Sequence, residues 1–188
     1  MSPGGSVRAF IALELDLGLR RAIGELQARL RPRLGGIRLV RPEAVHLTLR
    51  FLGETAPSQV DTLGPLLAAA AAACPPAGAR ACGLGAFPER GSPRVLWLGL
   101  EVPAPVLDLQ RACERAARAA GFEREARPFR PHLTLGRWRE RVPRPELGPV
   151  DLGETRLDTL VLFRSDLQPG GAVYAALARF PLGRPAVD

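Results

Sequence analysis

The sequence predicts an α+β fold made of two related halves. Segments with the alternation of strands and segments with the spacing of amphipathic helices follow one another along the whole chain. The tetrapeptide His-Leu-Thr-Leu occurs at residues 46–49 and again at 132–135, 86 residues later. No stretch shows the change of composition that marks a linker between independent domains. We therefore expect residues 1–188 to form a single domain of two lobes, a length sufficient to bury a core.

The chain is expected to open with a strand and a helix. Residues 7–15 form an apolar run that is typical of a buried strand. Residues 17–31 carry leucine and isoleucine at helical spacing with arginines between them, which predicts an amphipathic helix. Pro32 and the following glycines end this helix.

A second strand and a second helix complete the first half. Residues 45–52 alternate between polar and apolar side chains, as a half-buried strand does, and Gly53 closes the strand. Residues 58–74 include a run of alanines and stop at two prolines, which predicts a helix. Small alanine side chains would let this helix approach a sheet closely.

The second half is expected to contain five strands and one helix. Apolar side chains at helical spacing predict the helix over residues 105–120. A segment rich in proline and glycine predicts a loop over residues 142–153. The expected strands cover residues 79–87, 94–101, 131–137, 156–163 and 172–180.

The basic residues exclude several reaction classes. All 26 of them are arginine, against 19 acidic residues, which leaves a net charge of +7. Without lysine the chain has no phosphate-loop lysine, no Schiff base and no lysyl-adenylate intermediate. Base composition of the genome accounts for arginine in place of lysine, but it does not account for the excess charge. Because guanidinium groups bind phosphate bidentately, this excess favours a nucleic-acid partner.

The remaining composition gives no indication of a metal, a cofactor or a membrane. Two histidines and three scattered cysteines offer no zinc-binding spacing, so we expect neither a metal nor a cofactor. No apolar run approaches the length of a membrane span, and no secretion signal is evident. We expect a cytoplasmic monomer with reduced thiols that does not associate with membranes.

The repeated tetrapeptide contains both histidines of the protein. Side chains two residues apart share one face of a strand, so His46 and Thr48 point the same way, and so do His132 and Thr134. Two strands related by a pseudo-twofold axis would bring two imidazoles and two hydroxyls to one groove. A single His-x-Thr on a strand is usually an ordinary half-exposed pair, but two copies that hold the only histidines point to a catalytic site.

Two imidazoles without a metal or a lysine suit phosphoryl transfer. Near neutral pH one histidine can act as a base while another acts as an acid. An in-line displacement at phosphorus needs both, one for the attacking oxygen and one for the leaving oxygen. Threonine hydroxyls can donate hydrogen bonds to the non-bridging oxygens as their charge grows. The spacing alone does not assign the acid and the base.

At these residues the sequence resembles the two-histidine (2H) phosphoesterase superfamily. Within it, the chain is similar to the RNA 2',3'-cyclic phosphodiesterases, also called 2'-5' RNA ligases. The similarity covers nearly the whole chain, and the paired His-x-Thr-x motifs are its specific part. The supporting segments are residues 8–15, 45–54, 95–99 and 127–137.

The resemblance implies a fold, a reaction and a set of site residues. The fold would have two antiparallel sheets around a V-shaped central cleft, with the helices outside. The reaction would be metal-independent hydrolysis of an RNA 2',3'-cyclic phosphate to a 2'-phosphate. In the implied roles His46 is the proton donor to the leaving 3'-oxygen and His132 is the proton acceptor that activates water. Thr48 and Thr134 would hold the phosphate, and Arg137 would contact the substrate.

Side-chain parity adds two further candidates for substrate binding and raises one difficulty. Arg50 and Arg130 lie an even number of residues from a motif histidine and so share its face, although surface solvation is the more usual interpretation of each arginine on its own. Phe10 could stack on a base or belong to the core. Arg137 lies five residues after His132, so a straight strand would turn it away from the groove. Its role therefore requires a bend near Gly136.

Two other functions remain open. ATP-independent 2'-5' joining of RNA ends would use the same site in reverse, with a 5'-hydroxyl in place of water. A non-catalytic RNA-binding module would also suit the charge, but it would have no need for both threonines. The RNA substrate itself could be tRNA fragments or small cyclic nucleotides.

Overall fold

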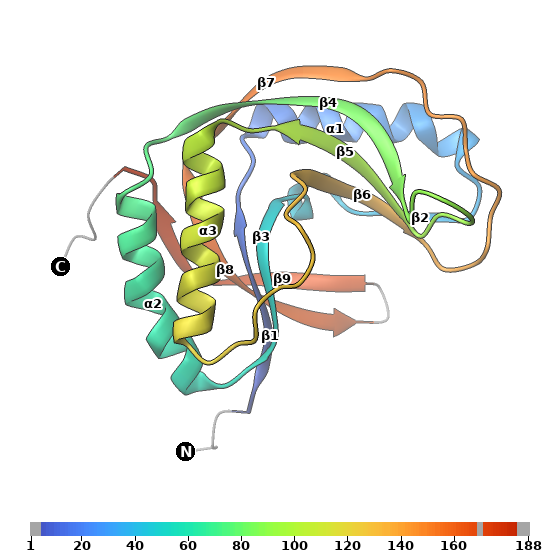
Figure 1. Ribbon diagram of the computed structural model, residues 1–188. Coiled ribbons are helices and arrows are strands. Elements are labelled where there is room, and N and C mark those ends of the chain that lie inside the picture. The colour runs from blue at the N-terminus through green and yellow to red at the C-terminus, as the bar shows by residue number, and fades with distance from the viewer. Residues whose placement is uncertain (1–4, 169–170, 184–188) are drawn as a thin grey trace.

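Strands dominate the computed structural model, which describes residues 5–168 and 171–183 (Figure 1). In chain order the strands are β1 (Val7–Leu13), β2 (Ile37–Leu39), β3 (Leu47–Thr55), β4 (Ala77–Phe87), β5 (Val95–Glu101), β6 (His132–Trp138), β7 (Asp151–Leu157), β8 (Thr159–Gln168) and β9 (Gly171–Pro181). They form one antiparallel sheet in the order β7-β4-β5-β6-β3-β1-β8-β9, and β2 pairs with β6. The mixed α/β fold that the sequence predicts is therefore confirmed.

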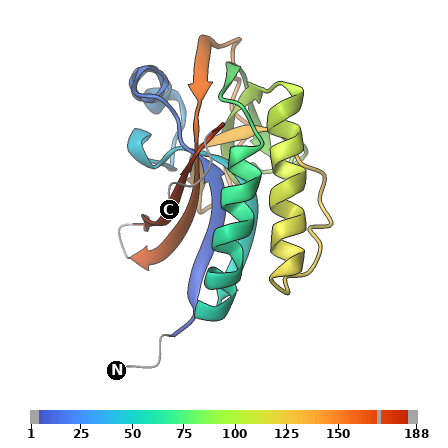
Figure 2. The ribbon, with the colours of Figure 1, turned by 90° about the vertical axis from the view of Figure 1, so that its left-hand side faces the viewer.

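The helices are α1 (Leu17–Leu30), α2 (Pro57–Ala72) and α3 (Ala104–Ala119), close to the predicted ranges. Figures 1 and 2 show α2 and α3 side by side, while α1 lies apart from them. The carboxylate of Asp16 begins α1 by accepting the amide of Leu19, and it also accepts the hydroxyl of Thr155 on β7. No helix in the described part of the chain is both long and apolar enough to cross a membrane.

The sheet consists of two halves with matching strand order. One half runs β3-β1-β8-β9 outward from the middle, and the other runs β6-β5-β4-β7. A single residue pair, Leu47 with Leu133, joins β3 to β6, and these two residues are themselves 86 positions apart. The two sheets implied by the resemblance thus meet at this pair and form one curled sheet (Figure 1).

Matching β-bulges interrupt β3 and β6 just beyond this pair. Leu49 is the extra residue in β3, and Leu135 is the extra residue in β6. The buried amide of Gln27 on α1 donates to the carbonyl of Leu135 at 3.0 Å, and Gln110 on α3 donates to the carbonyl of Leu49 at 3.5 Å. An extra residue reverses which face the following side chains point to, so parity changes at the same place in both motifs.

Two features of the strand prediction are wrong. The predicted strand at 156–163 is two strands, β7 and β8, which separate at Asp158 and lie near opposite ends of the sheet. The sequence carries no glycine or proline at this break, so the turn has no local signal. Strand β2 was not predicted, because three residues are too few to show alternation; it is defined by its pairing with β6.

Apolar side chains pack on both faces of the central strands. In β1, Ile11 and Leu13 point into the main core between sheet and helices. Phe10 and Ala12 point to the opposite face, where they pack with Val161. This second, smaller cluster lines the concave face that carries the candidate site.

Candidate active site

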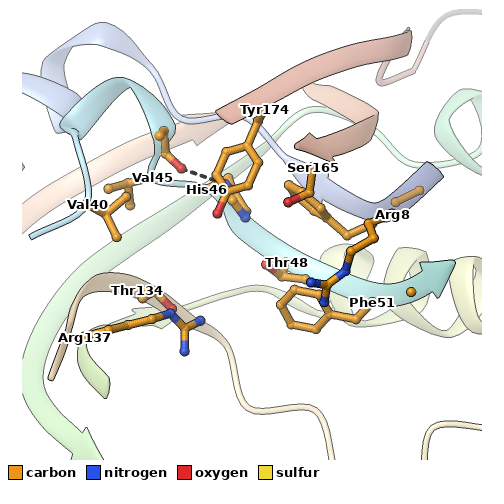
Figure 3. A pocket seen from close by; sticks show the side chains of 14 residues that line it. Arg8, Val40, Val45, His46, Thr48, Phe51, Thr134, Arg137, Ser165 and Tyr174 are labelled. Atoms are coloured by element: carbon orange, nitrogen blue, oxygen red, sulfur yellow. Dashed lines mark hydrogen bonds between the residues drawn. The ribbon is translucent and has the colours of Figure 1, made fainter. Parts of the chain in front are cut away.

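A pocket of about 220 Å³ opens on the concave face, where residues from both halves of the sheet meet (Figure 3). The second half contributes side chains of β6, and the first half contributes β1, β3, β8 and β9. The polar and aromatic lining residues are Arg8, Phe10, His46, Thr48, Phe51, Thr134, Arg137, Ser165 and Tyr174. Of the eight residues predicted for the site, five line this pocket: His46, Thr48, Thr134, Arg137 and Phe10.

The ring of His46 packs against two aromatic side chains. Its ring stacks on Phe10 at a centroid distance of 4.6 Å and meets the edge of Tyr174 at 5.2 Å. Nδ1 lies 2.8 Å from the carbonyl of Ala44, and because a carbonyl can only accept, Nδ1 carries the proton. Nε2 is therefore the nitrogen left for chemistry. Burial lowers the pKa of His46 to about 4, against the smaller opposing effect of the Ala44 bond.

His132 repeats this arrangement in the other half. Its Nδ1 lies 2.6 Å from the carbonyl of Arg130, again two residues earlier, so Nε2 is again the free nitrogen. The edge of Phe87 packs against its ring at 5.3 Å. His132 itself does not line the pocket, but it lies on the same face of β6 as Thr134 because pairing with β5 is regular between them.

The junction pair brings the two motifs next to each other, and three of the four motif side chains, His46, Thr48 and Thr134, line one pocket. Leu47 pairs with Leu133 in antiparallel register. Continued by one step to either side, this antiparallel register would set position 46 opposite 134 and position 48 opposite 132. The two strands share only this one pair, and the motif side chains lie on either side of it.

The bulge at Leu135 resolves the parity difficulty of Arg137. Thr134 pairs with Trp97 and Gly136 pairs with Leu96, so Gly136 points to the opposite face and Arg137 returns to the concave face. Arg137 lines the pocket beside Thr134 (Figure 3). Burial raises the pKa of the Tyr174 hydroxyl, and the positive charge of Arg137 partly opposes this rise.

The structure does not bring Arg50 to the pocket. The bulge at Leu49 turns Arg50 to the opposite face, where its Nε lies 2.6 Å from a carboxylate oxygen of Glu114 on α3. The side chain is 9% exposed and also bonds to the carbonyls of Phe51 and Glu123. These contacts join β3 to α3 and the loop that follows it.

Arg130 also lies outside the pocket. Its guanidinium pairs with Glu89 at 2.6 Å, and the group sits 5.0 Å above the ring of Phe87. Both partners belong to the second half of the chain, beside His132. The contacts place Arg130 at the surface near His132, not among the residues that surround His46.

Phe10 is buried in the structure, and Phe51, which the sequence did not single out, is the exposed one of the two. Phe10 is only 3% exposed, because His46 and Phe163 cover its two sides at 4.6 and 5.1 Å. Phe51 is 52% exposed at the mouth of the pocket. Phe51 and Arg137 occupy matching positions 86 residues apart, just after the two bulges.

Sequence reasoning missed four of the polar and aromatic residues that line the pocket. Arg8 shares a face of β1 with Phe10, so parity could have found it. Phe51 was missed because the bulge has no signature in sequence. Ser165 comes from β8, which only tertiary structure brings beside β1, and Tyr174 comes from β9, which pairs with β8. The sequence alone favours a packing or rim position for Tyr174.

No cysteine is among the residues that line this pocket. Cys74, Cys82 and Cys113 all lie outside the pocket. Burial raises the pKa of the Cys113 thiol to about 12, so it stays protonated near neutrality. Within residues 5–168 and 171–183, no three histidine, cysteine or acidic side chains cluster as a metal site would require.

Comparison with known proteins gives consistent matches. The model of the family described as "LigT like Phosphoesterase" matches residues 13–97 and 100–174. An RNA 2',3'-cyclic phosphodiesterase of Methanothermobacter thermautotrophicus is 33% identical, covering 94% of this chain and 99% of that protein. One from Thermus thermophilus is 36% identical over 94% and 90% of the two chains. The crystal structure of a Thermus thermophilus protein, TT0787, superimposes with a TM-score of 0.84 at 34% identity, covering 94% of this chain and 98% of that one.

Proposed function

The chain belongs to the LigT-like phosphoesterase family, and from this premise we propose that it hydrolyses RNA 2',3'-cyclic phosphate ends to 2'-phosphates. The observation that carries the proposal is the meeting of two His-x-Thr motifs at the Leu47–Leu133 pair. In this proposal two Nε2 atoms and two hydroxyls near the junction act on one phosphate. Relatives with the matching name cover nearly the whole chain, which supports the same reaction here.

In the proposed mechanism the two imidazoles divide the proton transfers. His132 Nε2 takes a proton from water while the water oxygen bonds to phosphorus. The bond from phosphorus to the 3'-oxygen breaks, and this oxygen takes the proton held on His46 Nε2. The product is a 2'-phosphate beside a free 3'-hydroxyl. Because burial disfavours a charged His46, its proton must be taken up as the anionic substrate binds.

The neighbouring polar groups bind the phosphate. The hydroxyls of Thr48 and Thr134 donate to the non-bridging oxygens from opposite sides of the junction. Arg137 on one wall and Arg8 on the other supply positive charge to the same pocket (Figure 3). In this scheme no step passes through a metal ion.

The nucleobase binds at Phe51. This ring is the exposed aromatic surface of the pocket, whereas Phe10 is covered on both sides. Stacking on an aromatic ring accepts any base, so it does not select one sequence. Arg8 lies near Phe51 in the pocket and adds a positive charge there (Figure 3).

The proposal extends to the substrates, the compartment and the oligomeric state of the protein. The substrates are RNAs with cyclic phosphate ends, among them tRNA fragments, and small cyclic nucleotides fit the same chemistry. Free cysteines, two of them buried, suit the reducing cytoplasm. We propose that the protein acts there as a monomer, because each chain carries both motifs.

The test uses an oligoribonucleotide that ends in a 2',3'-cyclic phosphate. The protein should release a 2'-phosphate end, and His46→Ala or His132→Ala should lower kcat at least 100-fold, as loss of a general acid or base does. His132→Ala with wild-type turnover would contradict the mechanism. The same assay with an added 5'-hydroxyl RNA measures joined product, and RNA bound without turnover would indicate a binding module.

A further inference from the structure

A second pocket of about 270 Å³ lies on the other side of His46 and Tyr174. Ala44, Val45, His46 and Tyr174 line both pockets, so the two spaces adjoin across a shared wall. The second pocket takes its remaining lining from the end of β1, the start of α1, the segment before β3, and strands β8 and β9. None of its charged residues takes part in the proposed reaction apart from His46.

Three guanidinium groups converge on this pocket from separate elements. Arg20 comes from α1, Arg41 from the segment before β3, and Arg179 from β9. Two carboxylates, Glu14 and Glu43, accompany them, which leaves one net positive charge. Glu14 already pairs with Arg179 at 3.3 Å. The buried Nε of Arg20 has no hydrogen-bond partner among the described residues.

The position of Arg20 is unfavourable for the fold. It lies in the first turn of α1, where the helix dipole concentrates positive charge and favours acidic side chains, and this turn contains none. Asp16 already occupies the N-cap, and its carboxylate is held by Leu19 and Thr155. An anion in the pocket would supply Arg20 with the negative charge that the first turn of α1 lacks.

We propose that the second pocket binds the phosphodiester group of the nucleotide that precedes the cyclic end of the RNA. The inference rests on the proposed function, because the cyclic phosphate must occupy the first pocket. An RNA strand carries its next phosphate one nucleotide away, and this pocket is the adjoining space with converging arginines. Guanidinium groups are the preferred partners of such phosphates. The site would therefore favour oligonucleotides over single nucleotides.

The experiment compares two substrates with the same terminal base. One is a nucleoside 2',3'-cyclic phosphate, and the other is a trinucleotide that ends in the same cyclic phosphate. The ratio of their kcat/KM values measures the contribution of the preceding nucleotides. We expect a preference of roughly 10-fold for the trinucleotide, the size of a charge-assisted contact to one phosphate.

Variants of opposite charge give effects of opposite sign. Arg41→Gln, and more strongly Arg20→Gln with Arg41→Gln, should reduce the ratio towards one and make its salt dependence shallower, with a log–log slope smaller by about 0.7. Glu43→Gln should raise the ratio. Arg21→Gln is the matched control, because Arg21 follows Arg20 in α1 but is exposed and outside the pocket. Thermal unfolding of each variant identifies any loss of folding, and Arg41→Gln does not touch the buried Nε.

The outcomes separate this inference from the function on which it rests. If the wild type hydrolyses neither substrate, the proposed function fails. If it hydrolyses both with equal kcat/KM, or if Arg41→Gln and Arg21→Gln lower the ratio equally, the phosphate site is wrong while the function stands. A ratio that falls with Arg41→Gln and rises with Glu43→Gln supports the site.

Discussion

His46 is packed so that its charged form is disfavoured until an anion arrives. Phe10 and Tyr174 remove water from the ring, while the carbonyl of Ala44 fixes Nδ1 as the protonated nitrogen. A phosphate beside Nε2 would supply the missing counter-charge and stabilise the imidazolium. Proton uptake and substrate binding are thus coupled at one side chain.

Nuclear magnetic resonance can measure this coupling, since the protein has only two histidines. In the free protein the imidazole of His46 should titrate with a midpoint near its pKa of about 4. Added inorganic phosphate should move the midpoint towards the ordinary value of 6.5. The variant His132→Gln assigns the signals. A midpoint near 6.5 without phosphate would contradict the burial argument.

The same shift makes stability depend on pH. Because the folded-state pKa is lowered, the folded protein prefers neutral His46, so the contribution is complete above about pH 6.5 and is lost as pH falls towards 4. The full loss is about 3 kcal/mol. His46→Gln should remove this dependence, so urea unfolding of wild type and variant should converge or cross as pH falls. A constant difference between them from pH 7 to pH 4 would argue against it.

Arg50 is expected to stabilise the fold and not to bind substrate. Its guanidinium is paired with Glu114 in a largely buried position. Arg50→Met would leave this carboxylate without its partner and should cost about 2 to 4 kcal/mol of unfolding free energy. KM for a nucleoside 2',3'-cyclic phosphate should stay within about twofold, below the roughly fivefold change that one kcal/mol produces. A large rise in KM with unchanged stability would return Arg50 to the substrate site.

The sequence predicts correctly which side chains face the site where the strand is regular, but not beyond the bulges. His46 with Thr48, and His132 with Thr134, follow from alternation alone, because no bulge separates the members of either pair. Beyond Leu49 the alternation reverses, so the parity rule selected Arg50 where the structure presents Phe51. The bulge depends on pairing with β1 and on a hydrogen bond from Gln110 on α3. Neither contact can be recognised from the residues next to Leu49 in the sequence.

At the scale of elements, α1 supports the site through Gln27. Its buried amide donates to the carbonyl of Val40 at 2.7 Å and to that of Leu135 at 3.0 Å. Val40 lines the first pocket, and Leu135 is the bulge residue between Thr134 and Arg137. One side chain of α1 thereby holds the backbone that turns Arg137 into the groove.

Gln27→Met should therefore affect both stability and binding. The carbonyl of Val40 would lose this donor, and the carbonyl of Leu135 would keep only the amide of Val40, which should cost about 1 to 3 kcal/mol. Arg137 would be held less firmly, which should raise KM for the cyclic phosphate. Gln59→Met is the matched control, because Gln59 donates to Ala120 at 3.0 Å, at the end of α3 and outside the pocket. Equal changes of KM in the two variants would show that Gln27 has no special role.

The elements themselves were predictable to the extent that their signals are local. All three helices end at prolines, caps or alanine runs that the sequence displays. The break at Asp158 between β7 and β8 was not predictable from the sequence. It arises because β8 pairs with β1 while β7 pairs with β4, which are long-range contacts. The pairing of β8 with β1 places Ser165 and Tyr174 in the pocket. For this reason the sequence predicts neither the break between the two strands nor these two site residues.

At the scale of the whole molecule, the two halves contribute one His-x-Thr motif each and share only the Leu47–Leu133 pair between their central strands. The two halves differ in the side chain that they present at one pair of matching positions in the pocket. Where the second half presents Arg137, the first presents Phe51 at the matching position. A nucleotide with a phosphate at one end and a base at the other has the same asymmetry.

A ligand held by both motifs should stabilise the junction from both sides. Without it, the strands on either side of the single pair have few backbone bonds to one another, and amide hydrogens there should exchange readily. A nucleoside 2'-phosphate, the proposed product, should slow exchange at residues 46–48 and 132–134 together, because Thr48 and Thr134 would hold the same phosphate. Hydrogen–deuterium exchange with peptide resolution measures this, with the Thr134→Val variant as control. In that variant both segments should lose protection, including the one in the unaltered half. Protection confined to one half would mean that the phosphate contacts only one motif, and a mechanism that needs both histidines at once would fail with it.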